Sequence, residues 1–335
     1  MKFGDVAIAD ANGAILAHSI TISGRKLAKG TVLADGDLEM LRAAGLAEVT
    51  VAQLETGDIS EDRAAAQLAA SLVPDAGKAG LNVGKAFTGR VNLNAVGPGI
   101  AYVDAEAITA LNQIDPMITL ATLPPLTRVG ARTLVGTVKI ISYAVSEVAL
   151  RRACDAARGA IGVHPVVRRG ATLILTRVPG MKETLVTKGQ EAVTARLRAL
   201  GLHLDAVVVV DHNIAELSAA LGGSASDMAL ILTGSATSDA YDVGPEAVRA
   251  AGGVVSRFGM PVDPGNLLFL GDVTGVPVIG LPGCARSPAL NGADWVLERI
   301  ACDVPVGSLD IARMGVGGLL KEIPLRPQPR EPKKR

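Results

Sequence analysis

Aromatic side chains are scarce in this chain, which has one Trp, three Tyr and four Phe among 335 residues. Proteins that bind single-stranded nucleic acid need aromatic faces on which bases can stack, and this supply is too small for that use. Positive charge is not in excess either, because 33 Lys and Arg residues balance 33 Asp and Glu residues. Without a global basic field, a polyanion has little to hold it. We therefore expect no nucleic-acid partner, although a small anion held by local geometry is still compatible with this composition.

Cysteine is equally sparse, and Cys154, Cys284 and Cys302 show no close-paired spacing. Neither a zinc site nor a disulfide framework is predicted, so we expect free thiols in a reducing cytosol. No uninterrupted apolar run reaches the roughly 18 residues that a membrane-spanning helix requires. The first residues, Met1 to Asp5, lack the apolar region of a signal peptide. The expected location is cytoplasmic, with no membrane partner.

The chain is long enough for about two or three domains, and 49% of its residues are hydrophobic, so a sizeable core is possible. Residues 1–75 alternate short apolar runs with turn signals, which predicts an N-terminal α/β region. Residues 76–150 are rich in Asn, Gly and Pro between β-type runs, which predicts a β-rich α+β region. Proline and charge dominate residues 324–335, so that segment is predicted to be a disordered tail.

Residues 165–305 alternate between strand and helix patterns. The predicted strands cover residues 170–176, 206–210, 228–232 and 276–281, and the predicted helices cover residues 189–200, 213–221, 245–251 and 289–301. Short, continuously apolar strands between helices are typical of a mostly parallel sheet that is covered on both faces. The predicted fold class is therefore α/β with a doubly wound sheet, whose ligands bind at the carboxyl ends of the strands.

The strand at residues 228–232 runs into a loop of small and hydroxyl-bearing residues. This loop comprises Thr233, Gly234, Ser235, Ala236, Thr237 and Ser238. Asp242 follows, and a helix is expected to begin near Pro245, because proline suits a first helical turn. Small residues let backbone N–H groups approach an anion, and the helix N-terminus adds partial positive charge. The loop is a candidate cradle for a phosphate or pterin, but an ordinary strand–helix turn explains it equally well.

A second candidate loop follows the strand at residues 276–281. Its candidate binding residues are Leu281, Pro282, Gly283, Arg286 and Ser287, and Pro264 and Gly265 precede the same strand. Gly283 permits backbone conformations that other residues resist. The cation and hydroxyl that follow it stand where an anion can be held. A structural turn is the alternative interpretation here as well.

In this order and spacing, the two loops resemble the molybdopterin-binding domain shared by MogA/MoaB-type adenylyltransferases and MoeA-type molybdenum insertases. Thr233 to Thr237 stands where that family has Thr/Ser-Gly-Gly-Thr/Val-Gly/Ser, and Asp242 stands at its acidic position. The Pro264-Gly265 pair and the Leu-Pro-Gly sequence at 281–283 are similar to the insertase branch. An earlier family acid matches Asp211. The resemblance covers about residues 165–305 and implies a MogA-like fold.

The resemblance also implies a metal role for two acids. Asp242 and Asp211 are predicted to lie at the carboxyl ends of neighbouring strands and to share a Mg²⁺ whose coordination a substrate phosphate completes. As catalytic residues, they would position that metal. The alternative for Asp211 is that it only caps the helix beginning near Asn213. His212 shows no partner in the sequence and is interpreted as an ordinary loop histidine.

The chain departs from the family pattern at several positions. Ser235 replaces the second glycine of the pentad, Asn266 stands where insertases often have lysine, and Cys284-Ala285 stands where they have Asn-Pro. Residues 176–180 lack the usual Gly-Asp/Asn-Glu motif. The chain as a whole resembles the N-terminal half of bacterial proteins that fuse this domain to a nucleotidyltransferase.

The resemblance implies a molybdopterin molybdenumtransferase-like enzyme of molybdenum cofactor biosynthesis. It would bind molybdopterin or adenylylated molybdopterin and assist molybdenum insertion. The alternative is a non-catalytic molybdopterin carrier that delivers cofactor to a partner nucleotidyltransferase or molybdoenzyme. A third hypothesis is a related domain that acts on another phosphorylated nucleotide. Domains of this family commonly associate, so a homo-oligomer is compatible with the resemblance.

Overall fold

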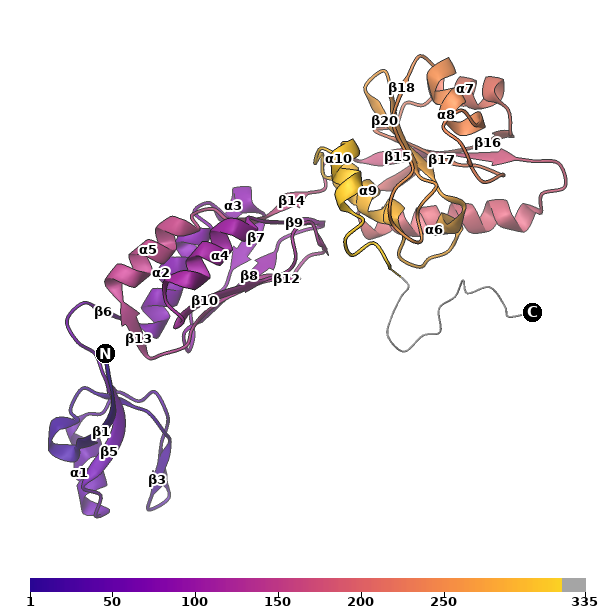
Figure 1. The fold of residues 1–335 in the computed structure, drawn as a ribbon. Helices are drawn as coiled ribbons and strands as arrows, with labels where there is room; N and C mark the ends of the chain where they lie inside the picture. Colours follow the sequence, from indigo (N-terminus) through magenta and orange to yellow (C-terminus); the bar gives the residue numbers. More distant parts are fainter. Residues whose placement is uncertain (321–335) are drawn as a thin grey trace, which may run out of the picture. The chain divides into compact units, whose positions relative to one another are not determined.

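The computed structural model describes residues 1–320, which form two compact units (Figure 1). Unit 1 comprises residues 1–97 and 101–163, and unit 2 comprises residues 98–100 and the residues from His164 onward. The predicted disordered tail lies outside the described residues. Within the part that is described, no helix is both long and apolar enough to cross a bilayer.

The first part of unit 1 is a small lobe with its own core. Its elements are β1 (Lys2–Ala7), η1 (Ile8–Asp10), β2 (Ile15–Leu16), β3 (Ile20–Ile22), β4 (Arg25–Leu27), α1 (Asp35–Ala43) and β5 (Glu48–Gln53). Strands β1, β5 and β2 pair antiparallel in that order. Alternate side chains of a strand share one face, so Val49 and Val51 of β5 both enter a core with Leu16 and Leu41.

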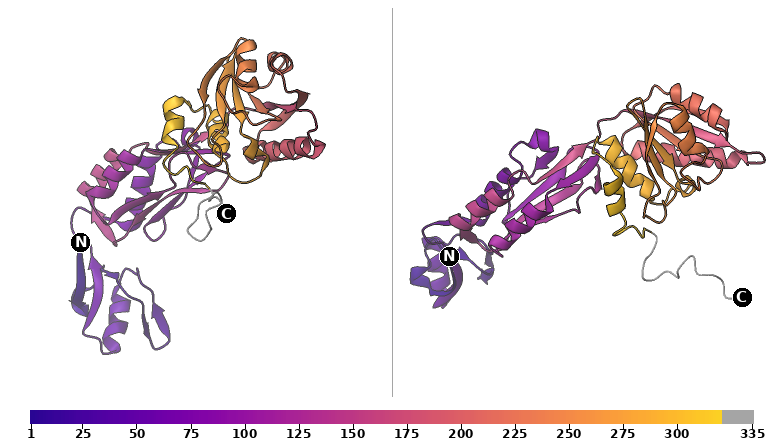
Figure 2. Two further views of the ribbon diagram at one scale, coloured as in Figure 1. Left: turned by 45° about the vertical axis from the view of Figure 1, so that its right-hand side comes forward. Right: turned by 45° about the horizontal axis from the view of Figure 1, so that its top comes forward.

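The remainder of unit 1 packs helices against antiparallel sheets. The helices are α2 (Glu61–Leu72), α3 (Ala76–Ala79), α4 (Ala105–Ile114) and α5 (Glu147–Ala156). The strands are β6 (Asp58–Ser60), β7 (Leu81–Val83), β8 (Arg90–Ala95), β9 (Gly99–Val103), β10 (Ile118–Thr122), β11 (Arg128–Val129), β12 (Leu134–Ile140), β13 (Ala144–Ser146) and β14 (Ile161–Pro165). Helices α2, α4 and α5 lie side by side over the sheet β10-β12-β8-β7 and share one core (Figures 1 and 2). The domain boundaries inferred from the sequence stay predictions.

Unit 2 contains a six-stranded, mostly parallel sheet. In spatial order its strands are β16 (His203–Asp211), β15 (Gly170–Arg177), β17 (Ala229–Leu232), β20 (Val276–Leu281), β19 (Phe269–Val273) and β18 (Val254–Phe258). The first four run parallel, whereas β19 and β18 are antiparallel additions. Every residue of β15 from Gly170 to Thr176 is buried, as expected for a central strand covered on both faces.

Helices cover both faces of this sheet (Figures 1 and 2). They are α6 (Glu183–Ala199), α7 (Ile214–Gly222), α8 (Val243–Ala250), η2 (Gly283–Arg286), α9 (Gly292–Ala301) and α10 (Ser308–Arg313). Apolar residues of α6, α9 and α10 share one core with Leu173 and Leu175 of β15. Those of α7 and α8 share another core with Ile174 of the same strand. Successive side chains of β15 therefore point alternately into the cores on the two faces of the sheet.

The strand–helix alternation predicted for residues 165–305 is confirmed for its four parallel strands. The hairpin of β18 and β19 was not predicted. Each of these strands has five residues, and their glycine and charged residues interrupt the apolar pattern. An antiparallel edge on an otherwise parallel sheet is common. Here the two-residue turn Thr274-Gly275 brings β19 back alongside β20, so these two strands pair as neighbours in the sequence.

Candidate functional site

The carboxyl ends of β15 and β17 form a topological switch point in the sheet. Leu175 of β15 pairs with Leu232 of β17, which pairs in turn with Leu281 of β20. After β15 the chain passes to α6 on one face, whereas after β17 it passes to α8 on the opposite face. The two connections leave in opposite directions, and the crevice that such a switch point creates is where ligands of open α/β sheets bind.

Thr176 connects the end of β15 to the residue 233–238 loop, which we call the first loop. The Thr176 side chain is 1% exposed. Its Oγ1 accepts the backbone N–H of Gly234 at 2.8 Å and lies 2.8 Å from Nδ1 of His212. Gly234 itself is packed tightly, because a Cβ added there would lie 2.6 Å from the carbonyl oxygen of Thr176. The first loop is therefore fixed at its second residue.

The role of Thr176, and with it the partner of His212, was missed in the sequence analysis. The interpretation of His212 as a loop histidine without a partner is wrong, because its ring contacts the Thr176 hydroxyl. The only local signal was a hydroxyl residue near the end of an otherwise apolar strand.

Replacing Thr176 with valine tests this anchor. Valine keeps the shape but leaves the Gly234 N–H without its acceptor, which we expect to cost about 1–3 kcal/mol in the free energy of unfolding. Ligand affinity at the crevice should fall roughly tenfold, equivalent to ~1.4 kcal/mol. Urea unfolding and calorimetric titration measure the two effects. The matched control is Thr172→Val near the other end of β15, where a buried hydroxyl contacts Ser226 Oγ at 2.9 Å. Equal losses of affinity in both variants would contradict the assigned anchor.

Within the first loop, two of the predicted hydroxyls turn inward. Thr233 Oγ1 donates to the carbonyl of Ser235 at 2.6 Å and lies 3.3 Å from Thr237 Oγ1, and both threonines are buried. Ser235 and Ala236, by contrast, are exposed, and their backbone N–H groups donate to no group among residues 1–320. Ser238 is exposed as well. Successive free N–H groups of this kind attract anions.

Asp242 closes the loop as the N-cap of α8. Its Oδ1 accepts the N–H of Val243 at 2.7 Å, and its Oδ2 accepts the N–H of Ser238 at 2.9 Å. The predicted helix start near Pro245 is thus confirmed, with an aspartate in the position that caps favour. Both carboxylate oxygens of Asp242 are already hydrogen-bonded within the protein.

The placement of Asp211 corrects the sequence analysis. Asp211 ends β16, and β15 lies between β16 and β17, so Asp211 and Asp242 do not follow neighbouring strands. Chain order places β16 directly before β17, but the sheet inserts β15 between them. Within residues 1–320, no group of three or more His, Cys, Asp or Glu side chains is arranged to hold a metal ion. The neighbouring-strand arrangement from which the shared magnesium site was predicted is therefore wrong, and no chemical step is derived from such a site.

The second loop, residues 281–287, is tied to the first by Arg286. Its Nη2 donates to the carbonyl of Thr233 at 2.7 Å. Its Nε is buried and has no hydrogen-bond partner. Burial also lowers the pKa of the Arg286 guanidinium, as expected for a cation removed from water without a counter-charge. An anion would satisfy this buried donor, and the guanidinium that carries it is already hydrogen-bonded to the loop that holds the two free backbone N–H groups.

A second arginine, Arg196 of α6, binds the backbone of the same loop, and the sequence analysis did not predict it. Its guanidinium donates to the carbonyls of Ala285 and Ser287, each at 2.8 Å, and pairs with Asp294 at 2.5 Å. The two hydrogen bonds hold the backbone of the second loop, and the ion pair with Asp294 of α9 fixes the guanidinium itself. Gly283 and Ser287 remain exposed in that loop, whereas Leu281 and Pro282 are buried.

Pro264 and Gly265 contact the start of α9 and lie outside the candidate ligand surface. Both are buried, and the carbonyl of Pro264 accepts the N–H of Gly292 at the start of α9. A Cβ on Gly265 would lie 3.0 Å from that nitrogen, so the approach requires glycine. Asn291, which caps α9, donates to Cys284 Sγ at 3.1 Å. The pair thus acts on the second loop through α9 and is not exposed to a ligand.

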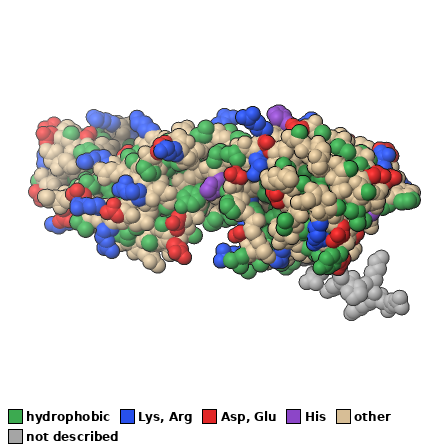
Figure 3. All heavy atoms as spheres, turned by 90° about the horizontal axis from the view of Figure 1, so that it is seen from above, with side chains coloured by type: hydrophobic (Ala, Val, Ile, Leu, Met, Phe, Trp, Pro, Cys, Tyr) green, Lys and Arg blue, Asp and Glu red, His purple; other side chains and the backbone are tan. Residues whose placement is uncertain are grey.

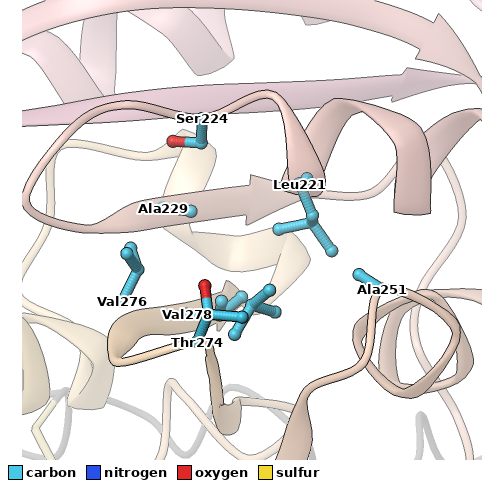
Figure 4. A pocket seen from close by; sticks show the side chains of 9 residues that line it. Leu221, Ser224, Ala229, Ala251, Thr274, Val276 and Val278 are labelled. Atoms are coloured by element: carbon cyan, nitrogen blue, oxygen red, sulfur yellow. The ribbon is translucent and has the colours of Figure 1, made fainter.

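A separate pocket of about 120 Å³ lies at the opposite end of the sheet (Figure 4). Ala229 and Val276, the first residues of β17 and β20, line it together with Leu221, Ser224 and Val278. Its volume is below the roughly 300 Å³ of typical ligand pockets, so it does not suit a pterin.

Charged side chains of both signs are interspersed over the face drawn in Figure 3. An anion must therefore be held by local donors such as Arg286.

Comparison with known proteins identifies the domain that carries this crevice. Residues 171–300 match the family model described as a probable molybdopterin binding domain. Residues 5–53 match a domain of unknown function. Among curated proteins, none matches the chain. One solved structure with some likeness is the molybdopterin biosynthesis MoeA protein from Pyrococcus horikosii, with 13% identity and a TM-score of 0.31 over 90% of this chain and 75% of that one.

Proposed function

We propose that the crevice at the ends of β15 and β17 binds the phosphate of molybdopterin, and that the protein acts in molybdenum cofactor biosynthesis. The observation that carries the proposal is the buried Nε–H of Arg286, which lacks a partner. The same guanidinium donates to the Thr233 carbonyl of the first loop, the loop in which the N–H groups of Ser235 and Ala236 are free. One phosphate offers oxygens to all of these donors. The match of residues 171–300 to the probable molybdopterin binding domain supports a pterin as the remainder of the ligand.

In the enzymatic form of the proposal, the protein is molybdopterin molybdenumtransferase-like. It binds molybdopterin or adenylylated molybdopterin as substrate and assists the insertion of molybdenum. Arg286 and the first loop hold the phosphate, and the exposed Ser235, Ser238 and Ser287 hydroxyls contact the ligand at the rim. Asp242, at the end of the first loop, is the proposed catalytic carboxylate. Magnesium enters only as a condition to be varied in the assay.

A non-catalytic carrier is the second candidate, and the acids favour it. Both oxygens of Asp242 cap backbone N–H groups, and Asp211 does not follow a neighbouring strand. A protein with this arrangement can hold molybdopterin and release it to a nucleotidyltransferase or to a molybdoenzyme without chemistry of its own.

Calorimetric titration tests the proposal and separates its two forms. The purified chain is titrated with molybdopterin and with adenylylated molybdopterin, each with and without Mg²⁺ and molybdate, and AMP is assayed in the same samples. AMP release that needs molybdate supports the insertase. Binding of either form without AMP release supports the carrier. If neither ligand binds, the proposed ligand is wrong.

A further inference from the structure

The Thr176 hydroxyl lies within hydrogen-bond distance of two groups, the Gly234 N–H and His212 Nδ1. A hydroxyl has one hydrogen to donate and two lone pairs to accept with. The Gly234 N–H occupies one lone pair. The hydroxyl hydrogen then needs an acceptor inside a site that is 1% exposed, and His212 Nδ1 at 2.8 Å is in place for it. A ring whose Nδ1 accepts carries its own hydrogen on Nε2.

The His212 ring is held by its neighbours on the chain. The His212 N–H donates to the carbonyl of Arg177 at 2.8 Å. On one side, the Asp211 N–H donates to Glu216 Oε2 at 2.8 Å. On the other, Asn213 caps α7 by accepting the N–H of Glu216 at 2.9 Å. With the backbone fixed on both sides, the ring is presented to Thr176 in one position.

We propose that His212 is a positioning residue for the first loop. Its Nδ1 accepts the Thr176 hydroxyl hydrogen, which leaves a Thr176 lone pair directed at the Gly234 N–H. The contact thereby fixes Gly234 and the two free N–H groups that follow it. The hydrogen-bond acceptor at the δ position orients Thr176, whereas the bulk of the ring has no part in this. The effect on a ligand rests on the proposed function, whereas the effect on Gly234 does not.

Three variants separate the acceptor from the ring. In His212→Asn an amide oxygen can occupy the place of Nδ1, in His212→Gln it lies one bond further out, and in His212→Leu there is no acceptor. We expect His212→Leu and His212→Gln to weaken molybdopterin binding about tenfold, as for one lost buried hydrogen bond. His212→Asn should stay within roughly threefold of the wild type. If His212→Leu binds as well as His212→Asn, the positioning role is overturned.

A readout without ligand keeps the inference independent of the ligand's identity. In ¹⁵N-labelled protein, the Gly234 amide should keep its chemical shift and its slow hydrogen exchange in His212→Asn and lose both in His212→Leu. The Thr172 amide, at the other end of the strand, should be unchanged in all variants. An unchanged Gly234 amide in His212→Leu overturns the inference. Failure of the wild type to bind any pterin, with the amide pattern as expected, overturns only the proposed function.

Discussion

In the enzymatic form of the proposal, replacing Asp242 with asparagine is expected to reduce AMP release from adenylylated molybdopterin by about 100-fold or more, the order of magnitude that a single catalytic side chain typically contributes. Asparagine has nearly the same size but neither the charge nor the basicity of aspartate. It is an equally good N-cap, so its amide oxygen can keep the Val243 N–H and α8 should persist. The measurement is AMP release in single turnover, with circular dichroism as a check of folding.

Asp239→Asn is the matched control for Asp242. Asp239 lies in the same connection and also accepts one backbone N–H, that of Tyr241, at 2.8 Å. It should retain turnover, because its carboxylate is exposed and is assigned no part in the reaction. Retained turnover in Asp242→Asn would remove the enzymatic form of the proposal. Unchanged pterin affinity in that variant, with no AMP release in the wild type, would instead identify the carrier.

Local signals in the sequence were sufficient for the parallel part of the sheet. The apolar run Leu230-Ile231-Leu232 is buried throughout, and such runs between helices indicate parallel strands. The helix starts near Asn213 and Pro245 were predicted correctly, but the capping role considered for Asp211 belongs to Asn213, and the cap of α8 is Asp242. Ser60 shows the limit of such signals. It stands at the N-cap of α2, yet its side chain makes no capping hydrogen bond.

What the sequence could not supply was the spatial order of the strands. Residues 203–211 precede residues 229–232 along the chain, so the acids that follow them were expected side by side. The chain instead returns across β15, which separates the two strands. That crossing also creates the switch point, so the feature that corrects the prediction for Asp211 is the same one that opens the crevice.

The missed site residues have partners far away in the sequence. Thr176 meets Gly234 across 58 positions, and Arg196 meets the second loop across 89 or more. No periodicity or local motif reports such contacts. The residues found from the sequence were those whose loops carry small, hydroxyl or basic residues in a row, such as Ser235 and Arg286. Of these, Thr233 and Thr237 proved to brace the loop from inside.

Replacing Arg286 with methionine is expected to weaken binding of molybdopterin by about 100-fold, because the ligand phosphate loses a half-buried cationic partner. The free energy of unfolding should change by less than about 1.5 kcal/mol. The variant loses the hydrogen bond to the Thr233 carbonyl, but it also no longer buries a guanidinium whose Nε lacks an acceptor. Calorimetric titration and urea unfolding of the same preparation measure both quantities.

Arg177→Met is the control that isolates the position of the charge from its presence. Arg177 ends β15 close to the same crevice, but its side chain is exposed and already paired with Glu183 at 2.9 Å. Its loss should therefore change affinity by no more than about threefold, since exposed ion pairs contribute little. Arg286→Lys should fall between the two, because lysine restores the charge without the fork of N–H groups. If all three variants weakened binding equally, the ligand would be attracted by net charge alone, and the buried Nε–H of Arg286 would have no special role.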